Sequence, residues 1–141
     1  MKTEFENDWR TKSIESLEQT FWPDIRYDEE SYLVGTCHKL RKKPLQEFKT
    51  EDLRIMIGQD IGTKYLMPLA IEKLTADLFA EGDFYPGDLL KMVLHIDKKF
   101  WLDNPAFWDS IANLISGRQE EIESHGISTD LFYTVGPKSS R

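Results

Sequence analysis

The sequence predicts an all-α protein, a single compact domain of about six or seven helices, some of them short. Three observations predict this class. Apolar residues recur at spacings of three and four, residues suited to helix caps precede these segments, and no convincing pair of strands can be found. With 141 residues, 40% of them hydrophobic, the chain is long enough to bury one core.

The pattern divides the chain into three parts. We expect residues 1–12 to be a flexible N-terminal segment and residues 13–126 to be the helical domain. Residues 127–141 are weakly patterned and are expected to form a C-terminal tail. Within this tail, the apolar residues between Leu131 and Val135 predict a short extended segment.

In the first half, each expected helix begins at a residue that can accept a hydrogen bond from the first turn. Ser13 is the expected cap of a helix over residues 14–20, and Asp28 of a helix that runs to about residue 41. Thr50 is the expected cap of the third helix. Thr63 begins a fourth, which reaches about residue 79.

In the second half, a helix is expected over residues 88–95, and Asp97 is suited to cap one further turn. Asn104 followed by Pro105 is typical of a helix start, a cap with proline in the first position. This last helix is expected to continue to about His125, where Gly126 ends it.

The stretch EGDFYPGDLL, residues 81–90, predicts a shaped turn rather than a generic linker. Gly82 and Gly87 supply backbone freedom, and Pro86 fixes its own φ. The turn leads into a helix near Asp88, where an acid suits the positive end of the helix dipole. Three acids and two aromatics therefore meet in one short segment.

Composition excludes several classes of function. A net charge of −7 and a pI near 5.0 argue against direct nucleic-acid binding and favour a basic partner. No apolar run approaches the roughly 20 residues of a membrane helix, and the polar N-terminus is not a signal peptide. Cys37 is the only cysteine, so no disulfide forms within the chain. We expect a cytoplasmic protein without membrane contact.

No catalytic, metal-binding or cofactor-binding set can be assigned. Cys37 and His38 are adjacent, so on a helix they point about 100° apart and cannot act as a nucleophile and its base. Cys37 falls on an apolar stripe and is expected in the core. His95 and His125 are expected near helix ends, and phosphate-binding glycine motifs are absent. We therefore expect neither cofactor nor enzyme activity.

Three runs carry a resemblance to a known family: CHKLRKKPL, EDLRIMIGQDIGTKYLMPLAIEKL and AEGDFYPGDLLKMVL. Together they resemble the immunity proteins of bacterial contact-dependent growth inhibition systems, over residues of about 13–95. The resemblance implies a non-enzymatic protein that binds the cognate C-terminal toxin domain of a large effector encoded upstream. It implies neutralisation of the toxin, usually by covering the active site. Many toxins of such systems are nucleases.

Two acidic surfaces that also contain a tyrosine are candidates for toxin binding. The first comprises Glu81, Asp83, Tyr85 and Asp88, and the second comprises Asp24, Tyr27, Asp28, Glu29 and Glu30. Two other functions stay open from the residues alone: a helical adaptor subunit, and a carboxylate- or metal-dependent hydrolase centred on residues 81–88. The sequence leaves the oligomeric state open.

Overall fold

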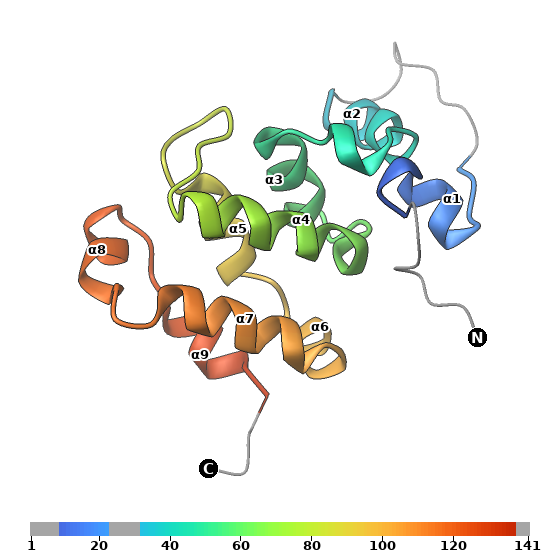
Figure 1. Cartoon of the computed structure of the whole chain (residues 1–141). Coiled ribbons are helices and arrows are strands. Elements are labelled where there is room, and N and C mark those ends of the chain that lie inside the picture. Colours follow the sequence, from blue (N-terminus) through green and yellow to red (C-terminus); the bar gives the residue numbers. More distant parts are fainter. Residues whose placement is uncertain (1–8, 23–31, 138–141) are drawn as a thin grey trace.

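The computed structural model of this chain describes residues 9–22 and 32–137. Within these residues the backbone forms nine α-helices and two 3₁₀ helices, and an isolated bridge pairs Glu81 with Pro86 (Figure 1). The all-α class is confirmed. In chain order the elements are η1 (Trp9–Thr11), α1 (Ile14–Glu18), α2 (Tyr32–Arg41), η2 (Leu45–Glu47), α3 (Thr50–Gly58), α4 (Thr63–Ala76), α5 (Asp88–Leu94), α6 (Lys98–Asp103), α7 (Pro105–Ile115), α8 (Gln119–Ser124) and α9 (Asp130–Val135).

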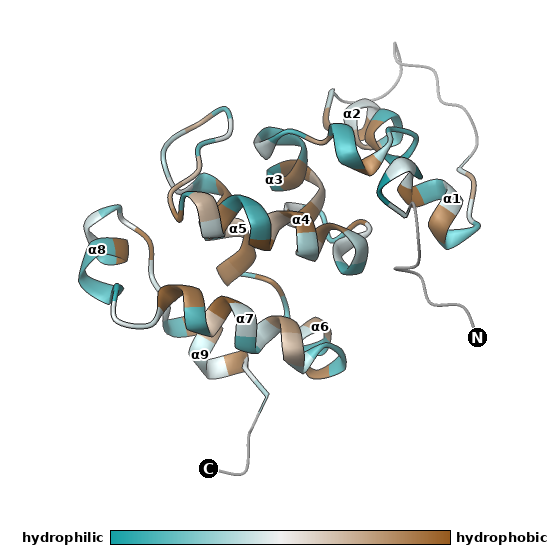
Figure 2. Cartoon of the chain, in the orientation of Figure 1, coloured by the Kyte–Doolittle hydropathy of each residue, from teal (hydrophilic) through white to brown (hydrophobic). Residues whose placement is uncertain are grey.

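Helix α3 lies at the centre of the fold, where it packs against α2, α4 and α5. Helix α4 also contacts α7, which packs against α6. In Figure 1, α1 and α2 lie at one end of the molecule, while α8 and the segment that leads into α5 lie at the other. Figure 2 shows hydrophobic and hydrophilic residues alternating along these helices, as expected where one face is buried. Fully buried side chains include those of Leu53, Met56, Leu66, Leu90 and Trp101.

Two of the predicted helix caps make their capping hydrogen bond, a third stands in the cap position without one, and a fourth is displaced. The Ser13 hydroxyl accepts the Ser16 N–H at 3.1 Å, and the Asp97 carboxylate accepts the Phe100 N–H at 3.0 Å. Asn104 directly precedes α7 as expected, but its side chain makes no capping bond. Thr50 is not a cap, because it is already the first residue of α3. The capping carboxylate is that of Asp52, which accepts the Lys49 N–H at 2.9 Å. The expected cap of α2, Asp28, lies outside the described residues.

A buried arginine fastens α2 to the end of α1. The Arg41 side chain is only 2% exposed, and its two terminal nitrogens donate to the Thr20 carbonyl at 3.0 and 2.9 Å. One of them also donates to the Glu18 carboxylate at 2.8 Å. The guanidinium lies over the Trp22 ring, 4.3 Å from its centroid. Arg41 therefore holds the chain in place after α1 ends.

The C-terminal third differs from the prediction in two ways. The single helix expected from residue 105 to 125 is wrong, because α7 ends at Ile115 and α8 begins at Gln119. Gly117 adopts a left-handed conformation (φ +77°), which is accessible to glycine and ends the α7 turn. At the other end of α8, Gly126 is left-handed as well (φ +76°) and follows the helix as expected.

The extended segment expected between Leu131 and Val135 is also wrong, because these residues form α9. Phe132 is fully buried and stacks on the Trp108 ring at a centroid distance of 4.8 Å. The Trp108 indole N–H donates to the Phe132 carbonyl at 3.1 Å. Packing against α7 thus selects the helix, a tertiary effect that the local apolar pattern does not encode.

Candidate functional site

The segment that leads into α5, residues 81–88, forms a closed loop at one end of the molecule (Figure 1). The loop narrows at its base, where Glu81 pairs with Pro86 and the Gly87 N–H donates to the Phe79 carbonyl at 3.0 Å. Gly87 has a φ of +94°, and a Cβ there would lie 2.8 Å from the Ile127 side chain. Glycine is therefore required at the point where the loop turns into α5.

The Asp88 carboxylate holds this loop from inside. It accepts the backbone N–H of Gly82 at 2.7 Å, of Phe84 at 3.0 Å and of Tyr85 at 3.4 Å. Asp88 is only 1% exposed. A carboxylate that accepts several N–H groups is a strong, charge-assisted anchor. The role of Asp88 is therefore to fix the loop backbone, and its side chain is not part of the surface.

Two residues of α3 hold the loop from outside. The Glu51 carboxylate accepts the Asp83 N–H at 2.8 Å and the Arg54 Nε–H at 2.7 Å. Arg54 Nε lies 3.9 Å from the Asp88 carboxylate, and the guanidinium lies over the Phe84 ring, 4.4 Å from its centroid. One cation thus joins both anchoring carboxylates and one face of an aromatic ring.

Gly82 is needed because the two anchoring carboxylates approach its backbone closely. A Cβ at this position would lie 2.5 Å from Glu51 Oε1 and 3.1 Å from an Asp88 oxygen. Any larger residue displaces at least one carboxylate from its N–H partners. Gly82 does not adopt a left-handed conformation, unlike Gly87, so the requirement for glycine comes from the space that the carboxylates occupy and not from the predicted backbone freedom.

The pKa values follow from these contacts. The hydrogen bond from Arg54 holds the pKa of the Glu51 carboxyl below its usual 4.5; burial opposes this, and the Asp83 N–H adds to it. The same bond raises the pKa of Arg54 further above its usual range. Glu51 is therefore charged in the folded protein down to a lower pH than in the unfolded chain.

Glu51→Gln is expected to lower the free energy of unfolding at neutral pH by about 1–3 kcal/mol, because charge-assisted hydrogen bonds to Arg54 and Asp83 are weakened. A carboxyl whose folded pKa is depressed stabilises the fold above its unfolded pKa, here about 4.5, and this stability is lost as pH falls through the folded pKa. Urea denaturation of both proteins should show their difference shrinking below about pH 4.5. A difference that is constant down to about pH 3 would contradict the assignment.

Only two of the four residues in the first predicted toxin-binding surface are exposed. Glu81 and Asp83 are exposed, Tyr85 is half-buried and Asp88 is buried. The five residues of the second predicted surface, Asp24, Tyr27, Asp28, Glu29 and Glu30, lie outside the described residues.

Three residues of the loop site were not in the predicted set. The Phe84 side chain is 66% exposed in the loop, and Glu51 and Arg54 reach it from α3. Phe84 follows Asp83 in the sequence, so the sequence alone was sufficient to place it in the loop. The contact between Glu51 and Asp83 spans 32 residues, and no local pattern indicates it.

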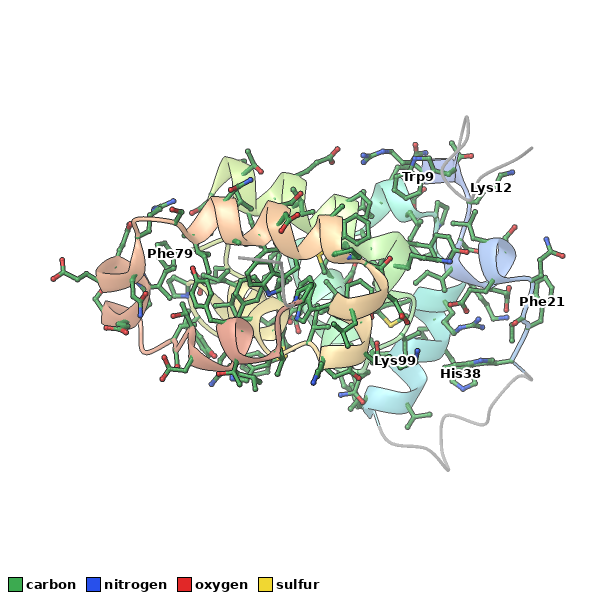
Figure 3. All side chains as sticks on the ribbon, turned by 90° about the horizontal axis from the view of Figure 1, so that it is seen from below. Trp9, Lys12, Phe21, His38, Phe79 and Lys99 are labelled. Atoms are coloured by element: carbon green, nitrogen blue, oxygen red, sulfur yellow. The ribbon has the colours of Figure 1, made fainter. Side chains whose placement is uncertain are left out.

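Cys37, His95 and His125 are each held by contacts that serve the fold. Cys37 is buried, and burial raises the pKa of its thiol, which disfavours the thiolate. His95 and His125 each bond a backbone carbonyl of their own helix, and the His125 ring stacks on Phe79 at 3.8 Å. Figure 3 shows Phe79 and His38 far apart along the molecule. Across the part of the chain that the structure describes, no three His, Cys, Asp or Glu side chains form a metal-binding group.

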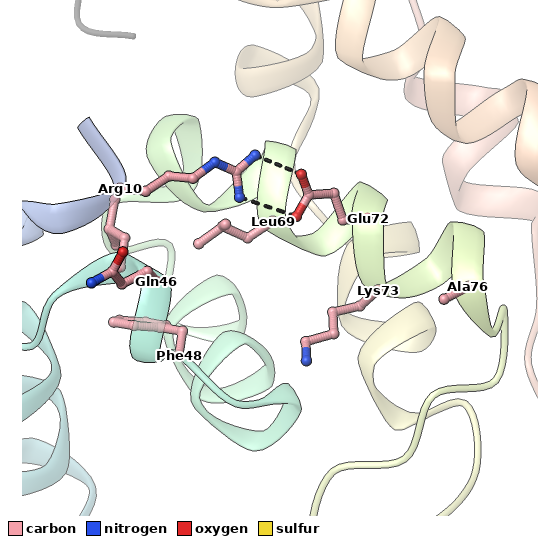
Figure 4. A pocket seen from close by; sticks show the side chains of 8 residues that line it. Arg10, Gln46, Phe48, Leu69, Glu72, Lys73 and Ala76 are labelled. Carbon is pink, nitrogen blue, oxygen red and sulfur yellow. Dashed lines mark hydrogen bonds and ion pairs between the residues drawn. The ribbon is translucent and has the colours of Figure 1, made fainter. Parts of the chain in front are cut away.

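A pocket of about 320 Å³ lies between η1, η2 and α4 (Figure 4). Leu69 and Phe48 contribute apolar walls, and Arg10 spans the rim. The Arg10 guanidinium makes two hydrogen bonds to Glu72, at 3.0 and 2.6 Å. This bidentate pair ties η1 to α4, so the polar groups at the rim serve the fold.

The fold and the loop together define the class of this protein. It is a helical protein with one loop, residues 81–88, whose backbone is held by hydrogen bonds and which exposes acidic and aromatic side chains. No helix within residues 9–22 and 32–137 is long and apolar enough to span a membrane.

A comparison with protein families matches residues 16–111, more than half of the chain, to the CDI immunity proteins. The chain belongs to this family, and the predicted resemblance is confirmed. Searches of curated proteins and of solved structures found no match.

Proposed function

We propose that this protein acts in the cytoplasm, where it binds the C-terminal toxin domain of an effector encoded upstream and neutralises it by covering its active site. Membership of the CDI immunity family supports a cognate toxin as the partner. The observation that supports the 81–88 loop as the toxin-binding surface is its construction. Its acids are exposed, and its backbone is fixed by hydrogen bonds to Asp88 and Glu51.

The charge of the protein supports a nuclease as the toxin. A nuclease holds phosphates and so presents a basic cleft. The net charge of −7 attracts such a cleft, and opposite potentials raise the rate of association. Glu81 and Asp83 are exposed at the loop and are placed to meet the cationic groups. The second acidic segment, residues 24–30, stays a prediction.

The geometry of the loop does not favour the hydrolase alternative. In such an enzyme, carboxylate oxygens converge on an open site and have free lone pairs for a metal or a water. Here both Asp88 oxygens accept backbone N–H groups, and Glu51 is held by Arg54 and Asp83. Asp88 is therefore committed to the loop conformation, and Glu81 and Asp83 are the carboxylates of residues 81–88 that remain exposed.

The proposal is tested by titration calorimetry against the purified C-terminal domain of the upstream effector. We expect nanomolar or tighter binding, about −12 kcal/mol or beyond. One equivalent of the protein should stop cleavage of transfer RNA or DNA by the toxin. No binding at micromolar concentrations would rule out the cognate-toxin function.

The role of the acids is tested by the double variant Glu81→Gln/Asp83→Asn. We expect association with the toxin to slow several-fold at low salt, and the difference to shrink as salt screens the charges. Asp103→Asn/Asp109→Asn is the matched control: it removes the same two charges from exposed positions on α6 and α7. Equal rates for the two double variants would mean that only net charge matters, and would place the contact elsewhere.

A further inference from the structure

We propose that Phe84 is the anchor of the interface: its ring enters an apolar pocket of the toxin whose rim carries Lys or Arg side chains. This inference rests on the proposed function and specifies the partner surface that the loop recognises. It adds to the role of charge, because it assigns the dissociation rate of the complex to an aromatic side chain. The acids then determine the association rate.

The exposure of Phe84 is built into the loop. Its side chain is 66% exposed, although its own backbone N–H is bonded to Asp88 at 3.0 Å. The neighbouring N–H of Asp83 is bonded to Glu51, so the chain on that side of the ring is fixed as well. A loosely held loop would let the ring fold onto the core. Here the fixed backbone keeps the aromatic ring in water.

Arg54 determines which part of the ring is free. Its guanidinium lies over the ring at 4.4 Å from the centroid, and the hydrogen bonds to Glu51 keep it there. A cation over one face of an aromatic ring stabilises that arrangement. The opposite face and the edge are left for a partner. An aromatic ring held in this way buries a large area on binding and loses little side-chain freedom.

The loop also excludes one common mode of recognition. The N–H groups of Gly82, Asp83 and Phe84 are already bonded to carboxylates within the protein. They are therefore not available to pair with a strand of the partner, as strand addition requires. Recognition through this loop therefore cannot use these three backbone donors and relies on its exposed side chains. The exposed aromatic and acidic side chains of the loop are Phe84, Glu81 and Asp83, whereas Tyr85 is half-buried. This set is complementary to an apolar pocket with a cationic rim.

Because the loop is fixed before binding, little ordering cost opposes association. The ring then has the properties of an interface hot spot: a large aromatic at the tip of a rigid element, surrounded by polar groups. Removal of such a residue shortens the lifetime of a complex more than it slows its formation. This separates the effect of Phe84 from that of the acids, which act on the association rate and depend on salt.

The test is the dissociation rate of Phe84→Ala from the toxin domain, measured by surface plasmon resonance with full-length protein. Phe21→Ala is the matched control, because Phe21 is 65% exposed, is the same residue type and lies at the opposite end of the molecule, where Figure 3 labels it. We expect Phe84→Ala to dissociate about 30-fold faster or more, at every salt concentration, and Phe21→Ala to match the wild type. Thermal unfolding should be nearly unchanged in both variants, since both rings are exposed.

A Phe84→Ala rate within about threefold of wild type would overturn the inference while the immunity function stands, provided that the wild type binds tightly. Accelerated dissociation of Phe21→Ala alone would place the interface at the other end of the molecule and would also overturn it. Failure of the wild type to bind the toxin would instead remove the proposed function itself. Phe84→Leu distinguishes an apolar pocket from an aromatic contact, and we expect it to retain part of the lost lifetime.

Discussion

Asp88→Ala is expected to lower the free energy of unfolding by about 3 kcal/mol and to release the 81–88 loop. The substitution removes a buried carboxylate and leaves the N–H groups of Gly82 and Phe84 without their acceptor. Hydrogen bonds to a charged group contribute about 1.5–3 kcal/mol, and an unsatisfied buried donor adds to the cost. Arg54, whose Nε lies 3.9 Å from this carboxylate, also loses one of its nearby acids.

Urea denaturation measures the loss of stability, and hydrogen exchange of the Gly82 and Phe84 amides measures the release of the loop. Asp83→Ala is the control, because its carboxylate is exposed in the same loop. We expect that control to unfold within about 0.5 kcal/mol of wild type. If Asp88→Ala were as stable as the control, or if the two amides stayed protected, Asp88 would not be the anchor of the loop.

Arg41→Met is expected to cost about 3 kcal/mol of folding free energy. The guanidinium is almost completely buried, and its removal leaves the Thr20 carbonyl and the Glu18 carboxylate without their donor. Breaking a buried ion pair on one side is strongly destabilising; because the Glu18 side chain is 35% exposed, water recovers part of the loss. Methionine preserves much of the volume, so the effect reports mainly on the polar contacts.

Arg41→Lys should recover only part of this stability. A lysine ammonium cannot reproduce the planar fork that contacts both Thr20 and Glu18 while lying over Trp22. Lys99→Met is the control on an exposed pair, and we expect its thermal midpoint to match that of the wild type. A fully stable Arg41→Lys protein would show that charge alone, and not the geometry of the guanidinium, holds α1 to α2.

The sequence predicted those parts of the fold that depend on neighbours along the chain. Ser13 and Asp97 were identified as caps because the acceptor and its N–H partner are three residues apart. The turn at residues 81–88 was identified from its glycines and proline. The break between α7 and α8 was missed, although Gly117 carried the signal, because the apolar spacing continues across it.

The parts that the sequence could not provide depend on contacts between distant segments. Asp88 was assigned to the surface, and only the structure shows its carboxylate turned inward onto three N–H groups. Glu51 and Arg54 belong to a helix some thirty residues earlier, and only the packing of α3 against α5 brings them to the loop. In α9, Phe132 packs on Trp108 of α7, a contact across 24 residues that no local pattern indicates.

The way in which the loop is fastened separates recognition from architecture. The Asp88 and Glu51 carboxylates bond the backbone N–H groups of residues 82–85. Among the side chains that point outward, Phe84 also contacts an anchor, because the Arg54 guanidinium lies over its ring. Exchanging the side chains at positions 81, 83 and 84 therefore leaves every one of those bonds in place. A few substitutions in such a loop can change the binding specificity, while the loop backbone and the helices that hold it keep their conformation. Under the proposed function, a few substitutions at these positions would adapt the loop to a toxin with a different surface.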